Sequence, residues 1–472
     1  MFDATAISFV AFLLIFIGIG VYSATRKKET AEDYLLASRS VNPWMTALSA
    51  VATNNSGFMF MGLIAEAYLF GISSMWLMVG WVAGDWMAWF VVHKPLRIQS
   101  EKSNSNTIPS FLAAGLENGH LVAIVAGLIT LVFLGLYAGA QLSAGGKALH
   151  SVFDWNVEIG ATVGAVIVAA YCFSGGIRAS IWTDVAQSIV MIIAMVLLFT
   201  VALIEVGGFA EMWSQLEAID PKLVEIAPSD FKFGFAGYLL GWMGAGAGVV
   251  GQPHVMIRAM ALDDPNNMPK ARRIYVTWYS IFAATCILVG LAARVLIPET
   301  PADPELALPI LSEQLLAPVL VGLILAGLFS ATISTADSQI LSCSAAVTHD
   351  LFPKLGQRYA VVKMATLGVT AFALLLVLSG NKSVFKMVVL AWSALASGLG
   401  PLMVARALRW PISTPIALAM MIIGVAGALF WKYVLEYSGD MYEVLPGMVA
   451  GFLTYVILVK LMPPSDSASK PT

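Results

Sequence analysis

Long apolar stretches, separated by short polar segments, follow one another along the whole chain. Each stretch has about the 20 residues that an α-helix needs to cross the hydrocarbon core of a bilayer. The pattern therefore predicts an all-α integral membrane protein with about 13 transmembrane helices, and residues 1–472 form a single membrane domain. The expected spans are residues 4–23, 42–68, 70–92, 121–142, 157–177, 183–206, 233–257, 272–297, 308–346, 360–379, 384–404, 412–431 and 443–462.

Composition and charge agree with a lipid environment. The chain is 59% hydrophobic and 12% charged, with a mean hydropathy of +0.82, more apolar surface than a soluble core can hide. If the N-terminus lies outside, 19 of the 26 Lys and Arg residues fall on the cytoplasmic side, as short loops prefer. We therefore expect a multi-pass protein of the cell inner (plasma) membrane, with the N-terminus outside and the C-terminus cytoplasmic.

Two of the expected spans carry breaks rich in small and polar residues. The first is Thr53-Asn54-Asn55-Ser56-Gly57, and the second runs from Gly244 through the following glycines to Pro253. Glycine in membrane helices often serves only close packing. Backbone that leaves the helix inside a bilayer must instead be satisfied by protein, water or ions, so paired breaks usually line a binding cavity. The spacing favours such a cavity.

The breaks open two groups of five spans, residues 42–206 and 233–404. An odd number of spans per group makes the second group enter the bilayer from the opposite side, which predicts an inverted repeat with both breaks near the midplane. Residues 4–23 then form an additional N-terminal helix, and residues 412–462 form two C-terminal helices.

The ninth span holds an unusual density of side-chain oxygens. At helical spacing Ser330, Ser334 and Asp337 share a face, with Thr335 and Ser338 beside them. Hydroxyl and carboxylate oxygens can replace the water shell of sodium. Buried Ser and Thr often only bond a carbonyl one turn back, but an acid at the centre of a membrane helix costs about 2.5 to 3.5 kcal/mol. We therefore expect a cation site here.

Two other embedded acids allow more than one interpretation. Asp184 follows Trp182-Thr183 at the expected start of the sixth span, where an acid either caps the helix or joins an ion site. Asp85, with Trp81 one turn before it and Trp86 directly after it, could pair with a basic group, but the sequence identifies none. The five histidines are scattered without the spacing of a zinc site or a catalytic base, and no basic stripe suggests nucleic acid. An enzyme and a nucleic-acid-binding protein are thus disfavoured.

Several motifs together resemble the sodium/solute symporter family, most closely its sodium/proline symporters. The likeness covers nearly the whole chain and implies a leucine-transporter-like fold that works by alternating access. The motifs are Ala52 to Gly62, Trp182-Thr183-Asp184, Gly251-Gln252-Pro253-His254 with Arg258, Ala271-Arg272-Arg273, and Ser334-Thr335.

The resemblance also implies site residues. The coupling ion would be Na+, and the partner a small organic solute, most simply an amino acid such as proline. One sodium would be held by the carbonyls of Ala52, Asn55 and Ala331 and the hydroxyls of Ser334 and Thr335. A further cation site in some relatives corresponds to Asp184, Ser334, Asp337 and Ser338. The substrate would lie against Ser56 and Gly57, with Asn54, Tyr137, Gln141, Trp242, Val249 and Pro253 around it.

The chain departs from these relatives at two places. They carry an aspartate where Asn54 stands, and Asp337 is one candidate for the missing charge. They also carry aromatic side chains where Ala245 and Val249 stand, which implies a wider cavity. The alternatives are a proton-coupled symporter of another organic solute, with Asp337 as carrier, and a transporter-like substrate sensor. The sequence leaves the oligomeric state open.

Overall fold

The computed structural model describes residues 4–25, 30–227, 230–354, 359–379 and 383–463, and almost all of them are helical. Within these ranges the only extended pairing is one bridge between Val41 and Leu262. The α-helices are α1 (Ala4–Ala24), α2 (Ala31–Leu36), α3 (Pro43–Gly57), α4 (Ile64–Phe70), α5 (Met75–Ala88), α6 (Lys94–Lys102), α7 (Ile108–Ala113), α8 (Gly119–Ile129), α9 (Gly135–Phe153), α10 (Val157–Val206), α11 (Phe209–Ile219), α12 (Gly234–Ala247), α13 (Pro253–Ala261), α14 (Met268–Leu296), α15 (Ala307–Leu315), α16 (Pro318–Ala345), α17 (Tyr359–Ser379), α18 (Val384–Ala407), α19 (Thr414–Tyr433) and α20 (Val444–Leu461).

The expected spans correspond to these helices, with some merged and one divided. In the described residues, ten helical stretches are long and apolar enough to cross a membrane. One of them, Pro43–Lys102, contains both the second and the third expected span. The fifth span is the shorter apolar helix Val157–Ala170, and the broken seventh span is divided between α12 and α13. The ninth expected span, residues 308–346, covers two helices. Helix α15 is separate and short, and α16 is the helix of that range that is long enough to cross the membrane.

The first predicted break is present and is centred on Ser56. This residue has φ 43° and ψ 176°, which interrupts the helix, and a wide π-helical segment, Phe58–Leu63, follows it. Positive φ is uncommon for a residue other than glycine and marks a backbone held in place by its surroundings. The break therefore depends on neighbouring helices that satisfy its polar groups.

The second predicted break is also present, but it lies at the end of the glycine-rich segment. Helix α12 ends at Ala247, a 3-10 turn covers Gly248–Gly251, and Gln252 is extended before α13 begins at Pro253. Proline at the first helical position lacks the N–H that would continue the earlier hydrogen-bond pattern. The sequence therefore starts a new helix at this point.

The earlier glycines of this segment serve packing. A methyl group at Gly246 would overlap the carbonyl of Trp81 and approach the amide of Asp85, so the backbones of α12 and α5 touch. Gly244 faces Leu445 at the start of α20 in the same way. Both interpretations of the glycines thus hold, each for a different part of the segment.

Helix α10 contains the fifth and sixth spans, which meet in a sharp bend at Gly176 with φ 60° and ψ −153°. The ring and the carbonyl of Tyr34 occupy the space where a side chain would start at this glycine. The sixth span consequently begins near Ile177, and Asp184 lies about two turns inside it. The interpretation of Asp184 as a helix cap is therefore wrong.

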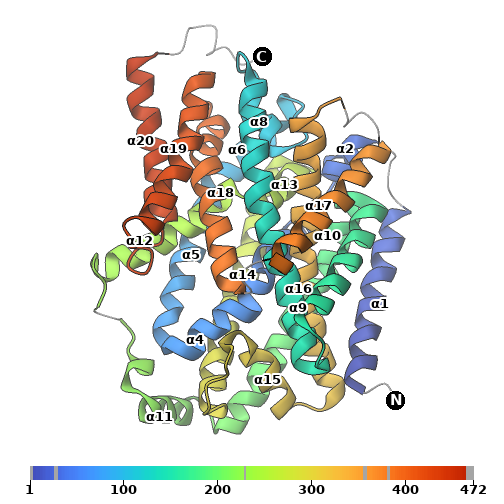
Figure 1. Ribbon diagram of the computed structural model, residues 1–472, viewed down its shortest axis with the longest axis vertical. Helices are drawn as coiled ribbons and strands as arrows, with labels where there is room; N and C mark the ends of the chain where they lie inside the picture. Colours follow the sequence, from blue (N-terminus) through green and yellow to red (C-terminus); the bar gives the residue numbers. More distant parts are fainter. Residues whose placement is uncertain (1–3, 26–29, 228–229, 355–358, 380–382, 464–472) are drawn as a thin grey trace.

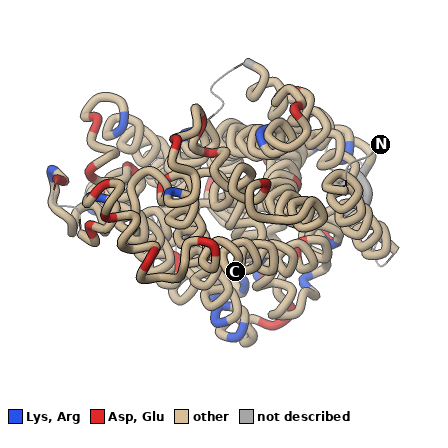
Figure 2. Tube along the Cα trace, turned by 90° about the horizontal axis from the view of Figure 1, so that it is seen from below, with Lys and Arg blue, Asp and Glu red and all other residues tan. Residues whose placement is uncertain are grey.

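Helix α16 runs through the centre of the bundle, where it packs against α10, α9, α3 and α1 (Figure 1). The start of α1 lies at the same end as α11 and α15, whereas α2 and the last residues of α20 lie toward the other end. Viewed from the end that carries α11 and α15, acidic and basic residues are interspersed among the connectors (Figure 2). Helix α16, which belongs to the second predicted repeat, is thus packed mainly against helices of the first repeat and against α1.

Candidate functional site

Tyr137 of α9 joins the two breaks. Its hydroxyl donates to Ser56 Oγ at 3.3 Å, and its ring meets the ring of His254 edge-on at 5.5 Å. The N–H of Gly57 donates to Gln141 Oε1 at 2.7 Å, so α9 satisfies a backbone group freed by the first break. The structure therefore brings four of the expected substrate residues, Ser56, Gly57, Tyr137 and Gln141, together beside the start of α13.

The other expected substrate residues divide into two kinds. Val249 is buried in the turn of the second break, and Pro253 opens α13 at its edge. Trp242 is stacked between Trp81, at 5.9 Å, and Tyr442, at 4.7 Å. Its side chain belongs to the packing of α12 on α5 and on the segment before α20. The expectation that Trp242 lines the substrate site is not supported by these contacts.

An aromatic residue that the sequence reasoning missed lies beside the second break. Trp392 of α18 is fully buried, donates from Nε1 to the carbonyl of Ala245 at 2.9 Å, and lies 6.4 Å from the ring of Tyr137. Trp392 is thus held against the backbone of α12 at Ala245, and the expectation of a wider cavity at Ala245 and Val249 stays a prediction. The only signal was a tryptophan in an otherwise apolar buried span.

The first group of expected sodium ligands lies where α16 crosses α3 just before the break. Ala52, Asn55, Ala331, Ser334 and Thr335 are all fully buried. Thr335 Oγ1 donates to the carbonyl of Thr53 at 2.9 Å, and this bond connects α16 to α3. Ser334 Oγ and the side-chain amide of Asn55 have no hydrogen-bond partner among the described residues. A buried hydroxyl without a partner fits a cation ligand, since leaving it unsatisfied is costly.

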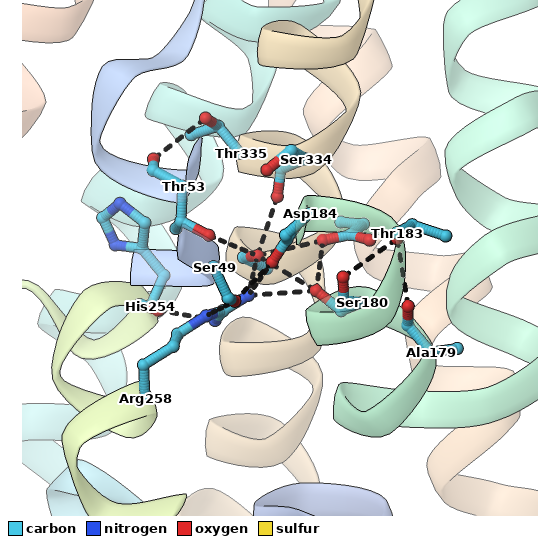
Figure 3. A network of polar contacts seen from close by, with 12 residues as sticks. Ser49, Thr53, Ala179, Ser180, Thr183, Asp184, His254, Arg258, Ser334 and Thr335 are labelled. Carbon is cyan, nitrogen blue, oxygen red and sulfur yellow. Dashed lines mark hydrogen bonds and ion pairs between the residues drawn. The ribbon is translucent and has the colours of Figure 1, made fainter. Parts of the chain in front are cut away.

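The second group consists of Asp184, Asp337 and Ser338. Arg258 reaches into it from α13, and its guanidinium meets Asp184 (Figure 3). Arg258 Nη2 donates to Asp184 Oδ2 at 3.3 Å and also to Ser338 Oγ. Ser49 Oγ donates to the same Asp184 oxygen at 2.6 Å and accepts from Arg258 Nε at 3.2 Å. A positively charged side chain of the protein itself thus occupies the middle of the expected second cation site.

Charge in this group is not fully balanced. Asp337 Oδ1 accepts from Ser180 Oγ and Ser338 Oγ, both at 2.9 Å, and Ser180 Oγ accepts from Arg258 at 3.0 Å. When both acids are ionised, two carboxylates face one guanidinium, which leaves one negative charge. Asp184 Oδ1 is buried and has no hydrogen-bond partner in the described part of the chain. This oxygen remains able to bind a cation.

Sequence reasoning placed Arg258 on the cytoplasmic side as part of a motif and did not give it a place in the site. In the structure its side chain is 1% exposed and its Nη1 donates to the carbonyl of His254, one turn earlier, at 2.6 Å. The short helix that follows the second break therefore aims this arginine inward. A basic residue one turn after Gly-Gln-Pro-His was the available signal. Thr183, by contrast, bonds back to its own helix and takes no part.

Asn54 faces neither the substrate residues nor Asp337. Its Nδ2 lies 2.5 Å from the hydroxyl of Tyr275 and 3.3 Å from Asp85 Oδ2, and the Tyr275 hydroxyl donates to that oxygen at 2.6 Å. The acid beside Asn54, the residue that replaces the aspartate of the relatives, is therefore Asp85. The basic partner that the sequence left open for Asp85 is not found among the described residues, where its partners are a phenol and an amide.

A pocket reaches the second group from one end of the molecule. It begins beside Tyr34 of α2 and Thr107 before α7, and it ends at Pro253, Arg258 and Ser338. The segments that carry α2 and α7 are predicted to lie in the cytoplasm. The side of the second group that these segments cover is therefore the side predicted to face the cytoplasm.

Salt bridges between side chains connect helices at the other end of the bundle. Lys147 Nζ lies 2.6 Å from Asp303 and 2.5 Å from Glu305, and Glu305 accepts the N–H groups of Val384 and Phe385 at the start of α18. Helices α9 and α18 are thus tied across the end that is predicted to face outside.

Comparisons with known proteins agree with this architecture. A family model described as the sodium:solute symporter family matches residues 34–424. The sodium/proline symporter of Salmonella typhimurium is 31% identical over 96% of this chain and 92% of its own length. The high-affinity proline transporter of Bacillus subtilis is 31% identical over 95% of this chain and 96% of its own length.

A solved structure has the same overall arrangement. It is a sodium-coupled sialic acid symporter in a substrate-bound, outward-open state, with a TM-score of 0.81 and 18% identity over 98% of this chain and 99% of that chain. At this identity the likeness concerns the fold alone. It confirms the all-α, leucine-transporter-like fold with inverted five-helix repeats.

Proposed function

The chain belongs to the sodium:solute symporter family and is a sodium-coupled secondary transporter of a multi-pass membrane type, and we propose that its solute is a small amino acid, with proline as the first candidate. The names of the relatives support this choice. The observation that carries it is the junction of the two helix breaks at Tyr137, beside buried oxygens that lack partners.

Sodium, in this proposal, binds to the carbonyls of Ala52, Asn55 and Ala331 and the hydroxyls of Ser334 and Thr335. Support comes from the full burial of these residues and from the unpartnered Ser334 Oγ. An ion shared by α3 and α16 favours the conformation in which the helices touch. If the solute favours the same conformation, each ligand raises the affinity for the other.

The second group supplies charge rather than a second complete ion site. Arg258 neutralises one of the carboxylates of Asp184 and Asp337, and the remaining negative charge balances one sodium ion at Ser334. We therefore propose one sodium per transport cycle. The unpartnered Asp184 Oδ1 and Ser334 Oγ are the atoms that would face this ion.

The solute, in turn, binds at the breaks. The polar groups gathered at the first break, including Ser56 Oγ and Gln141, suit the charged ends of an amino acid, as broken helices do in transporters of this architecture. Tyr137, Val249 and Trp392 provide apolar and aromatic surface for a compact side chain. A small ring such as that of proline matches this lining better than a bulky solute.

The arrangement of the chain in the membrane is part of the same proposal. Residues 42–206 and 233–404 form the two repeats, residues 4–23 form the additional N-terminal helix, and residues 412–462 add two C-terminal helices. The N-terminus lies outside and the C-terminus in the cytoplasm. Cysteine labelling of the two ends in intact cells tests this orientation.

Removal of the Ser334 hydroxyl tests the sodium site. Loss of one ligand to an ion costs about 1.5 to 3 kcal/mol, so the sodium concentration for half-maximal uptake by Ser334→Ala is expected to rise at least roughly tenfold. The measurement is labelled proline uptake into proteoliposomes at graded sodium concentrations. Ser188→Ala is the matched control, because its buried hydroxyl already donates to Val185 O at 2.8 Å. An unchanged sodium dependence in Ser334→Ala would contradict the site.

Competition of proline uptake by a panel of amino acids and organic acids, with and without sodium, tests the solute. We expect proline to compete best, and only with sodium present. Proline binding without any flux would instead indicate a transporter-like sensor. Uptake driven by a pH gradient without sodium would indicate proton coupling.

A further inference from the structure

A second buried polar cluster lies outside the sodium and substrate groups and connects three helices. It consists of Asn54 on α3, Asp85 on α5 and Tyr275 on α14, and is called the Asp85 cluster below. The exposed fractions of the three side chains are 5%, 1% and 0%. Asp85 Oδ2 accepts from the Tyr275 hydroxyl at 2.6 Å and lies 3.3 Å from Asn54 Nδ2, which donates over a shorter distance, 2.5 Å, to the Tyr275 hydroxyl.

Two acceptors in the Asp85 cluster are left without a partner. Asp85 Oδ1 and Asn54 Oδ1 are both buried and make no hydrogen bond with any described residue. No Lys, Arg or His of the described ranges forms an ion pair with Asp85. A buried carboxylate without a cation is strongly disfavoured in a membrane protein, so a mobile positive charge has to compensate it in part of the cycle.

The remaining titratable and charged groups near the Asp85 cluster do not supply that charge. From α14, the ring of Tyr279 packs at a tilt of 53° against the ring of Tyr275, with 5.7 Å between centroids, and Arg272 lies over the ring of Phe90. His93 is stacked on Trp89 and bonds to the carbonyl of Ala88. Tyr238 of α12 faces Trp242, and Arg258 is engaged by the second group.

The surroundings favour a proton over a metal ion as the compensating charge. A sodium ion needs several oxygens in place of its water shell. The Asp85 cluster offers two unpartnered side-chain oxygens, and Trp81 and Trp89 adjoin it. A proton requires only one of these oxygens, since a protonated carboxyl becomes a donor and no longer carries charge.

The Asp85 cluster is connected to both helix breaks. Asn54 lies two positions before Ser56, the centre of the first break. On the other side, Gly246 of α12 packs directly on the backbone of Trp81 and Asp85, just before the second break. A change of charge at Asp85 therefore acts on the segments that must move during transport.

We propose that Asp85, together with Asn54 and Tyr275, is a proton-binding site that links the protonation of Asp85 to the movement of the two broken helices. In one conformation Asp85 Oδ1 takes a proton from water (H3O+), and in another it returns the proton to water. Each transfer forms one O–H bond and breaks one. The site is separate from the sodium group at Ser334, and it requires neither proline as solute nor a particular sodium stoichiometry.

Infrared spectroscopy of the purified full-length protein tests the proton site without reference to any solute. As pH is lowered, the wild type is expected to gain a protonated-carboxyl band that Asp85→Asn lacks. Asp337→Asn, which removes another buried acid, is the matched control and should retain that band. A band unaffected by pH, or one that Asp85→Asn still shows, would overturn the proposal. Loss of the band on addition of sodium at constant pH would assign the site to sodium instead.

Uptake measurements test the link to the helix breaks. The rate of sodium-driven uptake by the wild type is expected to depend on pH through one titration. On the side where the active protonation state is scarce, the rate should change roughly tenfold per pH unit, as a single titrating group requires. Asp85→Asn should lose this transition. The double variant Asn54→Asp with Asp85→Asn moves the carboxylate to its hydrogen-bond partner and should restore it. The link between Asp85 and the helix breaks would be contradicted if Asp85→Asn showed the same pH transition as the wild type. It would also be contradicted if the double variant failed to restore the transition.

Discussion

Two buried acidic clusters contact α3 before the first helix break, one at Ser49 and the other at Asn54, and they are neutralised in different ways. Asp184 and Asp337 share one guanidinium and a set of hydroxyls, with Arg258 in their midst. Asp85 has a phenol and an amide as partners, and among the described residues no basic side chain. The first cluster therefore has a permanent cation built into the chain, whereas the second depends on a mobile one.

Burial and residue type therefore do not determine what a buried acid does, whereas the charge of its partners does. The permanent cation arrives on α13, a helix that belongs to the second break, so its charge moves with that break. The mobile cation binds between helices that flank both breaks. One cluster holds the moving parts together in a fixed charge state, and the other allows its charge state to change.

Removal of the permanent cation is expected to have the largest effect. Arg258→Met leaves Asp184 and Asp337 buried without their guanidinium, and the loss of one partner of a buried ion pair costs about 3–5 kcal/mol. We expect a much lower unfolding temperature in detergent and little uptake. Added sodium should stabilise Arg258→Met more than the wild type, because ions can enter the vacated position.

The control for this variant is Arg272→Met. Arg272 lies over the ring of Phe90 and forms no ion pair within the described chain, so its loss should lower the unfolding temperature only slightly. If Arg258→Met unfolded at the same temperature as the wild type without sodium, Asp184 and Asp337 would need no permanent cation, and the proposed difference between the two clusters would be wrong.

Asp337→Asn tests the charge left over in the first cluster. With one carboxylate fewer, the guanidinium balances Asp184 alone, and sodium at Ser334 loses an attraction of about 1–2 kcal/mol at an effective dielectric constant near 20. The sodium concentration for half-maximal uptake is therefore expected to rise roughly tenfold, while uptake at saturating sodium persists. Asp85→Asn, assayed in parallel at low pH, should leave this concentration unchanged. An unchanged sodium affinity in Asp337→Asn would remove Asp337 from the site.

Sequence alone sufficed for the helical spans and for both breaks, because lipid imposes a length on each helix and backbone breaks require glycine, proline or small polar residues. It also indicated the oxygen-rich face of α16. The partners of the buried acids were beyond its reach, since Arg258, Tyr275 and Trp392 come from helices far away in the chain. The start of the sixth span was misplaced because Gly176 alone makes a turn that hydropathy does not register.

Tyr275→Phe is expected to have the smallest effect and sharpens the account of Asp85. The variant loses the hydroxyl that donates to Asp85 Oδ2, while its ring can still pack against Trp89 and Tyr279. A donor stabilises the charged carboxylate by about 1 kcal/mol, so without it the proton binds more tightly. The midpoint of the pH dependence of uptake should therefore move to higher pH by roughly half to one unit. Tyr279→Phe is the control, because its hydroxyl has no hydrogen bond to Asp85. A midpoint that stays in place, or moves to lower pH, would show that Asp85 does not carry the titrating charge.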